Sequence, residues 1–296
     1  MINIFKKIWN LWDEFWFSPT DLRTLGLFRL ILGAILFLNY GLRHLNLSLF
    51  YYADGIVPPD VGASIFEGRF HSLLYWFPVE PWAVQLLHFG FLGSLLLLTL
   101  GVLPRSMALV ALFIHVLFEQ RNYMVVYGAD KVAACWLLYL ILCDSAQHFS
   151  LKQRFREGKK FLSTDLLSPV GVRLIQIQLC LIYAYSGLEK IKGPSWWSGG
   201  AVWTILTNGG LFPFDFSLVA QVPVLIAVAT YGTLIFETYF PFAILSPSLR
   251  KPWLIFGVFF HLMIALTMNL FFFSALMIVS YLFFYPLSFR DRAQAT

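Results

Sequence analysis

The sequence predicts an all-α polytopic membrane protein with about eight transmembrane helices. Of its 296 residues, 59% are hydrophobic and only 12% are charged, whereas a soluble domain carries about 25% charged residues. Ten tryptophans and 13 tyrosines are side chains of the kind that anchor helices at membrane–water interfaces. We therefore expect the lipid bilayer as the main partner, and the formal net charge of +5 requires no nucleic acid.

Residues 1–20 are expected to form an interfacial amphipathic helix. Apolar side chains recur at helical spacing, at Phe5, Ile8, Trp9, Trp12 and Trp16. The charged residues fall on the rest of the helix, which is typical of a helix lying in the membrane surface. Since no small-residue cleavage site follows, we expect this segment to be retained.

Residues 21–290 are expected to form a single transmembrane helical domain, because a crossing needs about 20 apolar residues. Six apolar stretches run through residues 22–42, 82–102, 106–118, 132–143 with an extension to about residue 148, 170–188 and 222–245. The last apolar run, residues 252–285, is too long for one crossing. We divide it near Asn269 into a seventh and an eighth span.

The basic residues predict the orientation. Residues 149–168 hold the densest basic run, at Lys152, Arg154, Arg156, Lys159 and Lys160, and basic loops mark the cytoplasm. Both termini are then cytoplasmic, and the outer loops are residues 43–81, 119–130 and 190–221. We expect an inner-membrane or plasma-membrane protein whose functional site faces the periplasm or the exterior.

Lys190 is the first candidate for chemistry, because it lies where an apolar helix meets a segment rich in glycine and tryptophan. An ammonium at a membrane boundary is costly, and loss of its proton turns the amine into a base. Trp196 and Trp197 offer a flat aromatic wall for a ring-shaped ligand. The structural alternatives are a lysine that extends to the headgroups and an interfacial tryptophan belt.

Two further charges, Arg29 and Glu237, fall inside predicted spans, where an unpaired charge costs several kcal/mol. Each should have a partner. Arg29 is expected in a structural ion pair or a helix clamp. For Glu237 the same structural role and a role as acid or base are both open. His261, with Asn269 and Ser274 in the last hairpin, is either a polar partner of the site or a neutral core histidine.

Other polar residues have simpler interpretations. Asp54 lies just outside the first span, where a solvated loop is the default, and Asp130 is expected to be the N-cap of the fourth span with Lys131 beside it. The three cysteines form no Cys-x-x-Cys pair and are predicted to be buried packing residues. The six histidines show no metal-ligand spacing, so no metal is predicted.

Five segments together resemble the horizontally transferred transmembrane (HTTM) family, which includes the transmembrane part of vitamin K-dependent γ-glutamyl carboxylase. They are residues 25–33, 52–55, 144–150, 183–200 and 261–274. Their order is that of the family, they extend over nearly the whole chain, and the stretch from Ser186 to Gly200 is the most specific.

The resemblance implies a bundle of eight or nine helices with an active site towards the exterior. In the carboxylase, the lysine matching Lys190 deprotonates a reduced vitamin K-like quinone. The quinol then reacts with O2, and the strong base so formed removes a proton from glutamate before CO2 adds. The candidate catalytic residues are Lys190, Glu237 and His261, the ligand-binding candidates are Tyr183, Gly187, Trp196 and Trp197, and the structural polar candidates are Arg29, Asp54, Asp130 and Asn269.

Two departures limit this transfer. Where the carboxylase has an Asn-Asn-His segment, residues 127–130 read Tyr-Gly-Ala-Asp, so a histidine-dependent step at that place is not expected. The 296 residues also include no counterpart of the large lumenal domain that binds a propeptide. We therefore do not expect propeptide-guided carboxylation of glutamate.

Three functions follow as hypotheses. The first is a quinol-dependent, carboxylase- or epoxidase-like enzyme, or a related oxidoreductase, with Lys190 as its base. The second is a maturation or export partner of a secreted peptide that works with a second membrane subunit, as implied by resemblance to the membrane component that matures a sporulation-delaying toxin. The third is a non-catalytic scaffold or transporter, against which the lack of an inverted repeat argues.

Overall fold

The chain is helical, as predicted. The computed structural model describes residues 2–59, 61, 77–78, 80–151, 162–207, 219 and 221–284. Within these ranges no β-strand forms, apart from an isolated bridge between Asp21 and Leu162. Most of the predicted basic run, parts of the outer loops 43–81 and 190–221, and the predicted cytoplasmic C-terminus lie outside the described residues.

The helices fall into two compact units, Met1–Ile175 and Gln176–Thr296. The first contains α1 (Ile2–Phe17), α2 (Leu22–Arg43), η1 (His44–Asn46), α3 (Leu47–Tyr51), α5 (Pro81–Leu100), α6 (Pro104–Arg121), η3 (Tyr123–Val125) and α7 (Gly128–Leu142). The second contains α9 (Pro194–Trp197), α10 (Ala201–Leu206), α11 (Pro223–Leu245), α12 (Pro247–Met268), α13 (Phe271–Ser280) and η6 (Tyr281–Phe283). The division falls within α8 (Leu167–Ile191).

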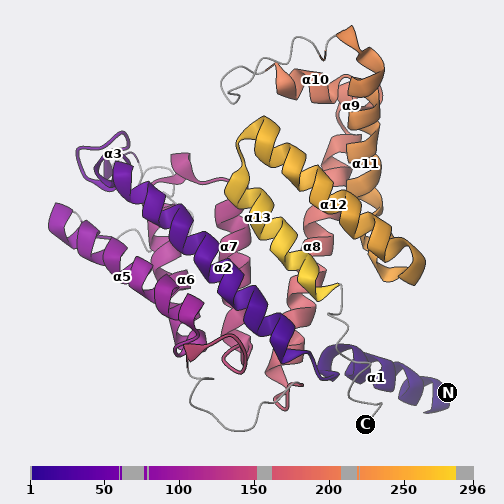
Figure 1. Ribbon diagram of the computed structural model, residues 1–296, viewed down its shortest axis with the longest axis horizontal. Coiled ribbons are helices and arrows are strands. Elements are labelled where there is room, and N and C mark those ends of the chain that lie inside the picture. The colour runs from indigo at the N-terminus through magenta and orange to yellow at the C-terminus, as the bar shows by residue number, and fades with distance from the viewer. Residues whose placement is uncertain are drawn as a thin grey trace. The chain divides into compact units, whose positions relative to one another are not determined.

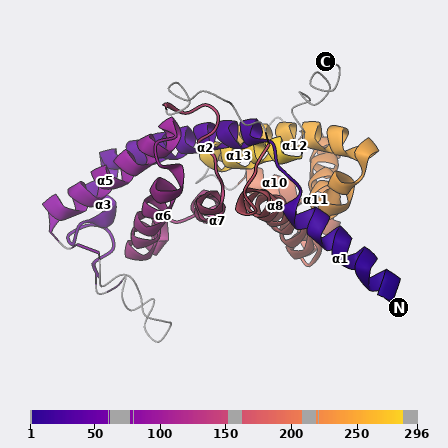
Figure 2. The ribbon, with the colours of Figure 1, turned by 90° about the horizontal axis from the view of Figure 1, so that it is seen from below.

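Each unit is built from neighbouring helices that pack in chain order. In the first, α2 packs on α5, α5 on α6 and α6 on α7 (Figure 1; Figure 2). In the second, α11 packs on α12 and α12 on α13, while the short helices α9 and α10 lie against α11 (Figure 1). Short connections between long apolar helices favour such antiparallel neighbours.

Prolines and left-handed residues mark the helix ends. A proline opens each of α5, α6, α11 and α12, where its missing N–H removes no helical hydrogen bond. At the other end, Gly101 (φ 72°) ends α5 and Asn269 (φ 55°) ends α12 in the left-handed conformation that stops helices. The predicted division of the last apolar run near Asn269 is therefore confirmed.

Two predicted boundaries are wrong. The fourth apolar helix ends at Leu142 instead of extending towards His148, because Cys143 takes an extended conformation (ψ 137°). The seventh begins at Pro247 rather than Pro252, since a proline is well suited to the first position of a helix.

Five helical segments are long and apolar enough to cross a membrane: Leu22–Tyr51, Pro81–Leu100, Leu167–Ile191, Pro223–Leu245 and Pro247–Met268. The other three predicted spans are weaker by the same measures. Helix α6 carries three charged residues, α7 has 15 residues, and the apolar stretch at α13 runs only over Phe271–Phe283. Beyond the five, the count of eight spans and the position of both termini stay predictions.

Helix α1 has the amphipathic character expected of it. Its apolar side chains Ile8, Trp9 and Trp12 are exposed. The Arg173 guanidinium of α8 donates to the Phe15 carbonyl at 2.7 Å and lies over the Phe15 ring, which ties the end of α1 to the rest of the first unit. Contact of the exposed face with lipid headgroups stays a prediction.

Candidate functional site

One face of α8 carries the polar residues of the candidate site. Tyr183, Ser186, Gly187 and Lys190 follow one another at spacings of three, one and three residues, which places them on a single side of a helix. This arrangement aligns a phenol, a hydroxyl, a glycine and an amine along the side that meets α11 and α12.

Lys190 lies in a buried ion pair. Its Nζ is 2.7 Å from Glu237 Oε2 and donates to Ser186 Oγ at 2.7 Å. The side chains of Lys190 and Glu237 are 22% and 7% exposed, and the contact is an ion pair by distance rather than a directed hydrogen bond. The sequence predicted an amine neutralised by apolar surroundings. The structure gives it a carboxylate partner, so the candidate group is the pair of Lys190 and Glu237.

A close approach between helices brings the two charges together. A Cβ added to Gly187 would lie 2.7 Å from the backbone nitrogen of Thr238 in α11, so only glycine lets the two backbones come this near. Thr238 follows Glu237 directly. The predicted ligand-binding role of Gly187 is thus a packing role in the structure, and through packing it positions the ion pair.

Glu237 lies deep in its helix. It is the fifteenth of the 23 residues of α11, roughly 21 Å from one end and 12 Å from the other at 1.5 Å per residue. Pro241 follows four residues later and lacks the N–H that would bond to the Glu237 carbonyl. A charged pair beside a weakened turn, midway along an apolar helix, marks a functional candidate rather than ordinary packing.

The aromatic segment after α8 covers the pair on one side. Lys190 Nζ lies 5.3 Å from the centroid of the Trp196 ring, within the range of a cation–π interaction. Trp197 points elsewhere, because it is 60% exposed and its Nε1 donates to the Ile191 carbonyl at 2.6 Å. Tyr231 of α11 donates to the Trp197 carbonyl at 2.7 Å and so fixes the segment on α11.

An open depression of about 480 Å³ borders the amine. It is lined by Ile182, Tyr185, Ser186, Glu189, Lys190 and Trp196. The lining combines the Lys190 ammonium, the Ser186 hydroxyl and the Trp196 indole with a larger apolar surface. Lys192 does not contribute, since it is 68% exposed and pairs with Glu189 at 2.6 Å, a hydrogen bond that raises the pKa of Lys192.

His261, predicted as a third member of the site, lies in a different cluster. Its Nε2 is 2.5 Å from the Tyr183 hydroxyl, which also bonds to the Tyr281 hydroxyl, and all three residues are buried. Of the predicted neighbours of His261, Asn269 is exposed at the end of α12. The structure therefore brings Lys190 and Glu237 together, and places His261 with Tyr183 in a hydrogen-bonded lock between α8, α12 and η6.

Arg29 is a helix clamp, the second of its predicted structural roles. The guanidinium is fully buried and donates to five backbone carbonyls, those of Gly26, Leu98, Thr99, His148 and Phe149, at 2.5 to 3.5 Å. Two of these close the last turn of α5, where the helix dipole is negative and favours a cation. Arg29 thus joins α2, α5 and the segment after α7.

The predicted roles of the two aspartates differ in outcome. Asp54 is exposed in the loop after α3, as expected.

Asp130 is not the N-cap of α7, because the cap position belongs to Tyr127, whose backbone N–H donates to Asp130 Oδ2 at 3.1 Å. Lys131 instead pairs with Glu119 at 3.1 Å. Asp130 is a buried member of a larger network on α2 and α6, which the sequence gave no spacing signal to find.

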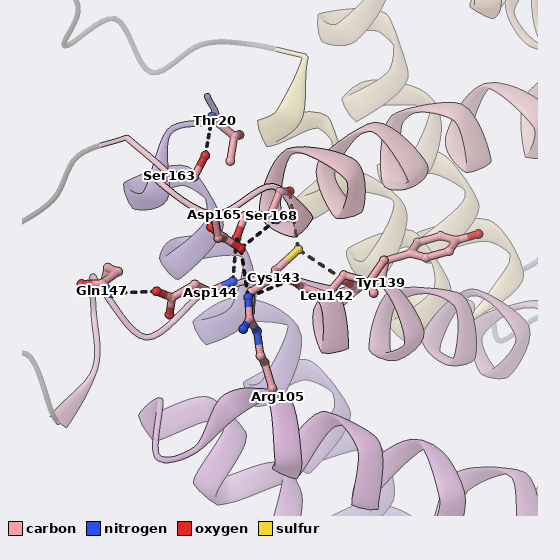
Figure 3. Close-up of polar contacts among 10 residues, drawn as sticks. All are labelled: Thr20, Arg105, Tyr139, Leu142, Cys143, Asp144, Gln147, Ser163, Asp165 and Ser168. Carbon is pink, nitrogen blue, oxygen red and sulfur yellow. Dashed lines mark hydrogen bonds and ion pairs between the residues drawn. The ribbon is translucent and has the colours of Figure 1, made fainter. Parts of the chain in front are cut away.

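A polar cluster joins the ends of three helices in the first unit (Figure 3). Arg105 donates to the carbonyls of Leu142 and Cys143, at 3.0 and 3.2 Å, and pairs with Asp165 at 3.0 Å. Asp165 Oδ2 accepts the backbone N–H and the hydroxyl of Ser168. The cation thereby caps the end of α7 and the anion caps the start of α8, each matching its helix dipole.

Where the structure describes them, the cysteines and histidines form no metal site. The buried Cys143 thiol donates to the Tyr139 carbonyl at 3.3 Å, and burial raises its pKa, which keeps it a thiol. Cys135 and Cys180 are half-buried and free. Within the described residues, no group of three or more His, Cys, Asp or Glu side chains is placed to hold a metal ion.

Fold and site together define a multi-helix membrane protein with a lysine–carboxylate pair buried between two long helices. The chain belongs to the HTTM domain family, whose family model matches residues 17–289. It is 26% identical over 197 residues to the uncharacterised protein YitO of Bacillus subtilis, covering 63% of this chain and 62% of YitO. It is 24% identical over 187 residues to the sporulation-delaying protein SdpB of the same organism, covering 60% of this chain and 57% of SdpB.

These matches define the family and leave the activity open. The aligned part spans about three-fifths of the length of the two curated relatives. No solved structure matches the chain.

Proposed function

We propose that this protein is a membrane enzyme in which Lys190, paired with Glu237, takes a proton from a carbon or oxygen acid at an outward-facing site. The single observation that carries the proposal is the geometry of the amine. Lys190 reaches a buried carboxylate and a hydroxyl, both at 2.7 Å, and still borders an open depression walled by Trp196.

The donors of the ammonium explain how a ligand would be held. A lysine ammonium has three N–H donors. One is donated to the Ser186 hydroxyl at 2.7 Å, and the ion pair with Glu237 is not a directed hydrogen bond, so an N–H remains for an oxygen of a ligand in the depression.

The proton step uses both members of the pair. The substrate's O–H or C–H bond breaks and its proton passes to Lys190 Nζ, while Nζ passes one of its own protons to Glu237 Oε2, 2.7 Å away. The amine ends as an ammonium, the carboxylate becomes a carboxylic acid, and the substrate keeps the electron pair. Glu237 thus lets Lys190 act as a base although it rests as a cation.

We propose a reduced quinone, with O2 and CO2, as the co-reactants, from the family resemblance. The donor set fits a phenolic ring, because the ammonium and Ser186 would hold its hydroxyl and the Trp196 indole would stack on its face. When bound, such a quinol supplies an acidic hydroxyl and two reducing electrons. The residues of this chain orient the hydroxyl, exclude water and take up the proton.

The predicted catalytic role of His261 becomes a positioning role in this proposal. His261 and Tyr281 hold the Tyr183 hydroxyl, two turns of α8 away from Lys190. They fix the height and rotation of α8 and thereby the place of the amine.

The test is quinol oxidation and incorporation of labelled bicarbonate by the full chain in lipid nanodiscs. We expect Lys190→Ala to lower the rate by about 10²–10⁴-fold. Lys190→Arg, which keeps the positive charge but cannot give up its proton, should lose the same activity while staying folded. Lys192→Ala is the matched control and should keep the wild-type rate; equal rates for Lys190→Ala and wild type would refute the proposal.

A second candidate function is favoured by the similarity to SdpB, whose name links that relative to sporulation delay. In this alternative, the chain is a membrane partner in the maturation or export of a secreted peptide, together with a second membrane subunit. Co-purification with a small secreted precursor, and peptide maturation that survives Lys190→Arg, would favour it over the enzyme. A scaffold or transporter would show neither catalytic turnover nor a precursor.

A further inference from the structure

A second buried network of ionisable groups lies in the first unit, where α2, α6 and α7 meet. The Tyr40 hydroxyl is 2.6 Å from His115 Nδ1 and 2.9 Å from Asp130 Oδ1. Arg43 donates to the same Asp130 oxygen at 2.8 Å. Tyr40, His115 and Asp130 are each at most 3% exposed, so they are shielded from bulk solvent.

The other imidazole nitrogen faces acceptors. His115 Nε2 is 3.0 Å from the Asp130 carbonyl oxygen and 3.5 Å from Glu119 Oε1. A carbonyl oxygen has no proton to donate, and Glu119 is held as a carboxylate by Lys131 at 3.1 Å. His115 Nε2 therefore carries a hydrogen.

Counting protons shows that the network holds one more than a neutral histidine supplies. If Nε2 carries the only imidazole hydrogen, Nδ1 must accept from Tyr40, and the single Tyr40 hydrogen is then unable to reach Asp130 as well. Two oxygen atoms would face each other at 2.9 Å without a hydrogen between them. One additional proton, on either His115 or Asp130, removes this conflict.

Arg43 decides where that proton lies. Its guanidinium, 2.8 Å from Asp130 Oδ1, favours the ionised carboxylate. The proton then belongs to His115, whose Nδ1 donates to Tyr40 while Tyr40 donates to Asp130. In this arrangement both ring nitrogens of His115, the Tyr40 hydroxyl and Asp130 Oδ1 each have a hydrogen-bond partner of the correct kind.

We propose that His115 is a proton-binding site that holds α2 and α7 together: as an imidazolium it lets Tyr40 donate to Asp130, and on losing a proton it takes the Tyr40 hydrogen for itself. The Tyr40–Asp130 bond, which joins α2 to α7, is then lost. Proton release at this place loosens the packing of the first unit without touching Lys190.

Charged and titratable groups of the described residues surround His115 on several sides. Asp130 and Glu119 face His115, with Arg43 and Lys131 behind them. Tyr51 of α3 and Tyr127 before α7 lie near Arg43, and Phe91 of α5 contacts the imidazole ring.

Nitrogen-15 NMR of the histidine side chains tests the proposal directly, using the full chain in nanodiscs at neutral pH. The signal that His115→Gln removes identifies His115. We expect it to show two protonated ring nitrogens; a neutral ring with its hydrogen on Nε2 would overturn the proposal. Because this readout needs no enzymatic activity, it can fail or succeed independently of the proposed function.

A second variant keeps the test decisive if His115→Gln does not fold. Tyr40→Phe preserves the ring packing but removes the hydroxyl that accepts from Nδ1. We expect one histidine signal to change from the doubly protonated to the neutral form in this variant. Unchanged histidine spectra would overturn the proposal.

Discussion

Gly187 of α8 and Thr238 of α11 lie so close that a methyl group on Gly187 would come within 2.7 Å of the Thr238 backbone nitrogen. This contact sets the distance between the two helices at the level of the ion pair. The Lys190–Glu237 separation of 2.7 Å therefore depends on a residue that itself has no side chain.

Replacing Gly187 by alanine should push the two helices apart. We expect Gly187→Ala to destabilise the protein by about 1–3 kcal/mol, as overpacking does, and to weaken any activity that requires the ion pair. Thermal unfolding of the purified variant measures the first effect. Gly232→Ala on α11 is the control, because its added Cβ would meet its nearest neighbour, Phe256, only at 4.0 Å. Equal losses in both variants would contradict the close-approach argument.

Replacing one member of the Lys190–Glu237 ion pair should destabilise the protein more than replacing both members. Lys190→Met leaves a carboxylate that is only 7% exposed, and we expect a loss of up to about 3 kcal/mol, near the lower end for buried pairs. The double variant Lys190→Met/Glu237→Leu should recover part of that loss. A double-mutant cycle in chemical or thermal unfolding measures the coupling.

The neighbouring exposed pair serves as the comparison for this cycle. Lys192 and Glu189 are 68% and 45% exposed, and exposed pairs contribute little to stability. Lys192→Met should therefore unfold like wild type. A coupling for the Lys190–Glu237 pair that is no larger than that of the exposed pair would show that burial does not strengthen it.

Replacing the Arg29 guanidinium by the single amine of a lysine should destabilise the protein. A lysine at this place has one nitrogen and is unable to reach carbonyls on α2, α5 and the segment after α7 together, so several buried carbonyls lose their donor. We expect Arg29→Lys to cost at least about 2 kcal/mol. The same change at Arg23, a partly exposed residue one turn and a half earlier on α2, should have a much smaller effect in the same unfolding assay.

Cys143 should be unreactive in the folded protein. Burial raises its pKa, so the reactive thiolate stays scarce as the pH rises from neutral to mildly alkaline, where an exposed cysteine with a pKa of about 8.5 ionises. Maleimide labelling followed by mass spectrometry should find Cys143 modified only after denaturation. Labelling of the native chain at the rate of the denatured chain would show that the cluster of Figure 3 opens in solution.

The lengths of the apolar stretches, and the residues that interrupt them, were enough to predict the long helices. The division at Asn269 was predictable because an apolar run of that length exceeds one crossing. The early start at Pro247 and the end at Leu142 were missed, since the charged residues Arg250 and Lys251 precede the apolar run and Cys143 continues an apolar stretch. Local backbone conformation, not hydrophobicity, decides both ends.

The candidate site was only partly predictable. Lys190 and Glu237 were each singled out by their depth, yet their pairing depends on the approach of α8 to α11 at Gly187, which no spacing within one helix reveals. The contact of His261 with Tyr183 was not predictable for the same reason. The network of Tyr40, His115 and Asp130 was missed because its members come from three helices and match no short motif.

The depth of Glu237 in α11 also bears on how the protein is made. Insertion of a single helix into the bilayer is unfavourable when a carboxylate lies near its middle. Since α8 precedes α11 in the chain, the ammonium of Lys190 is already synthesised when α11 leaves the ribosome. We therefore expect sequential insertion, in which α8 stays beside the translocon and acts as an intramolecular chaperone for α11.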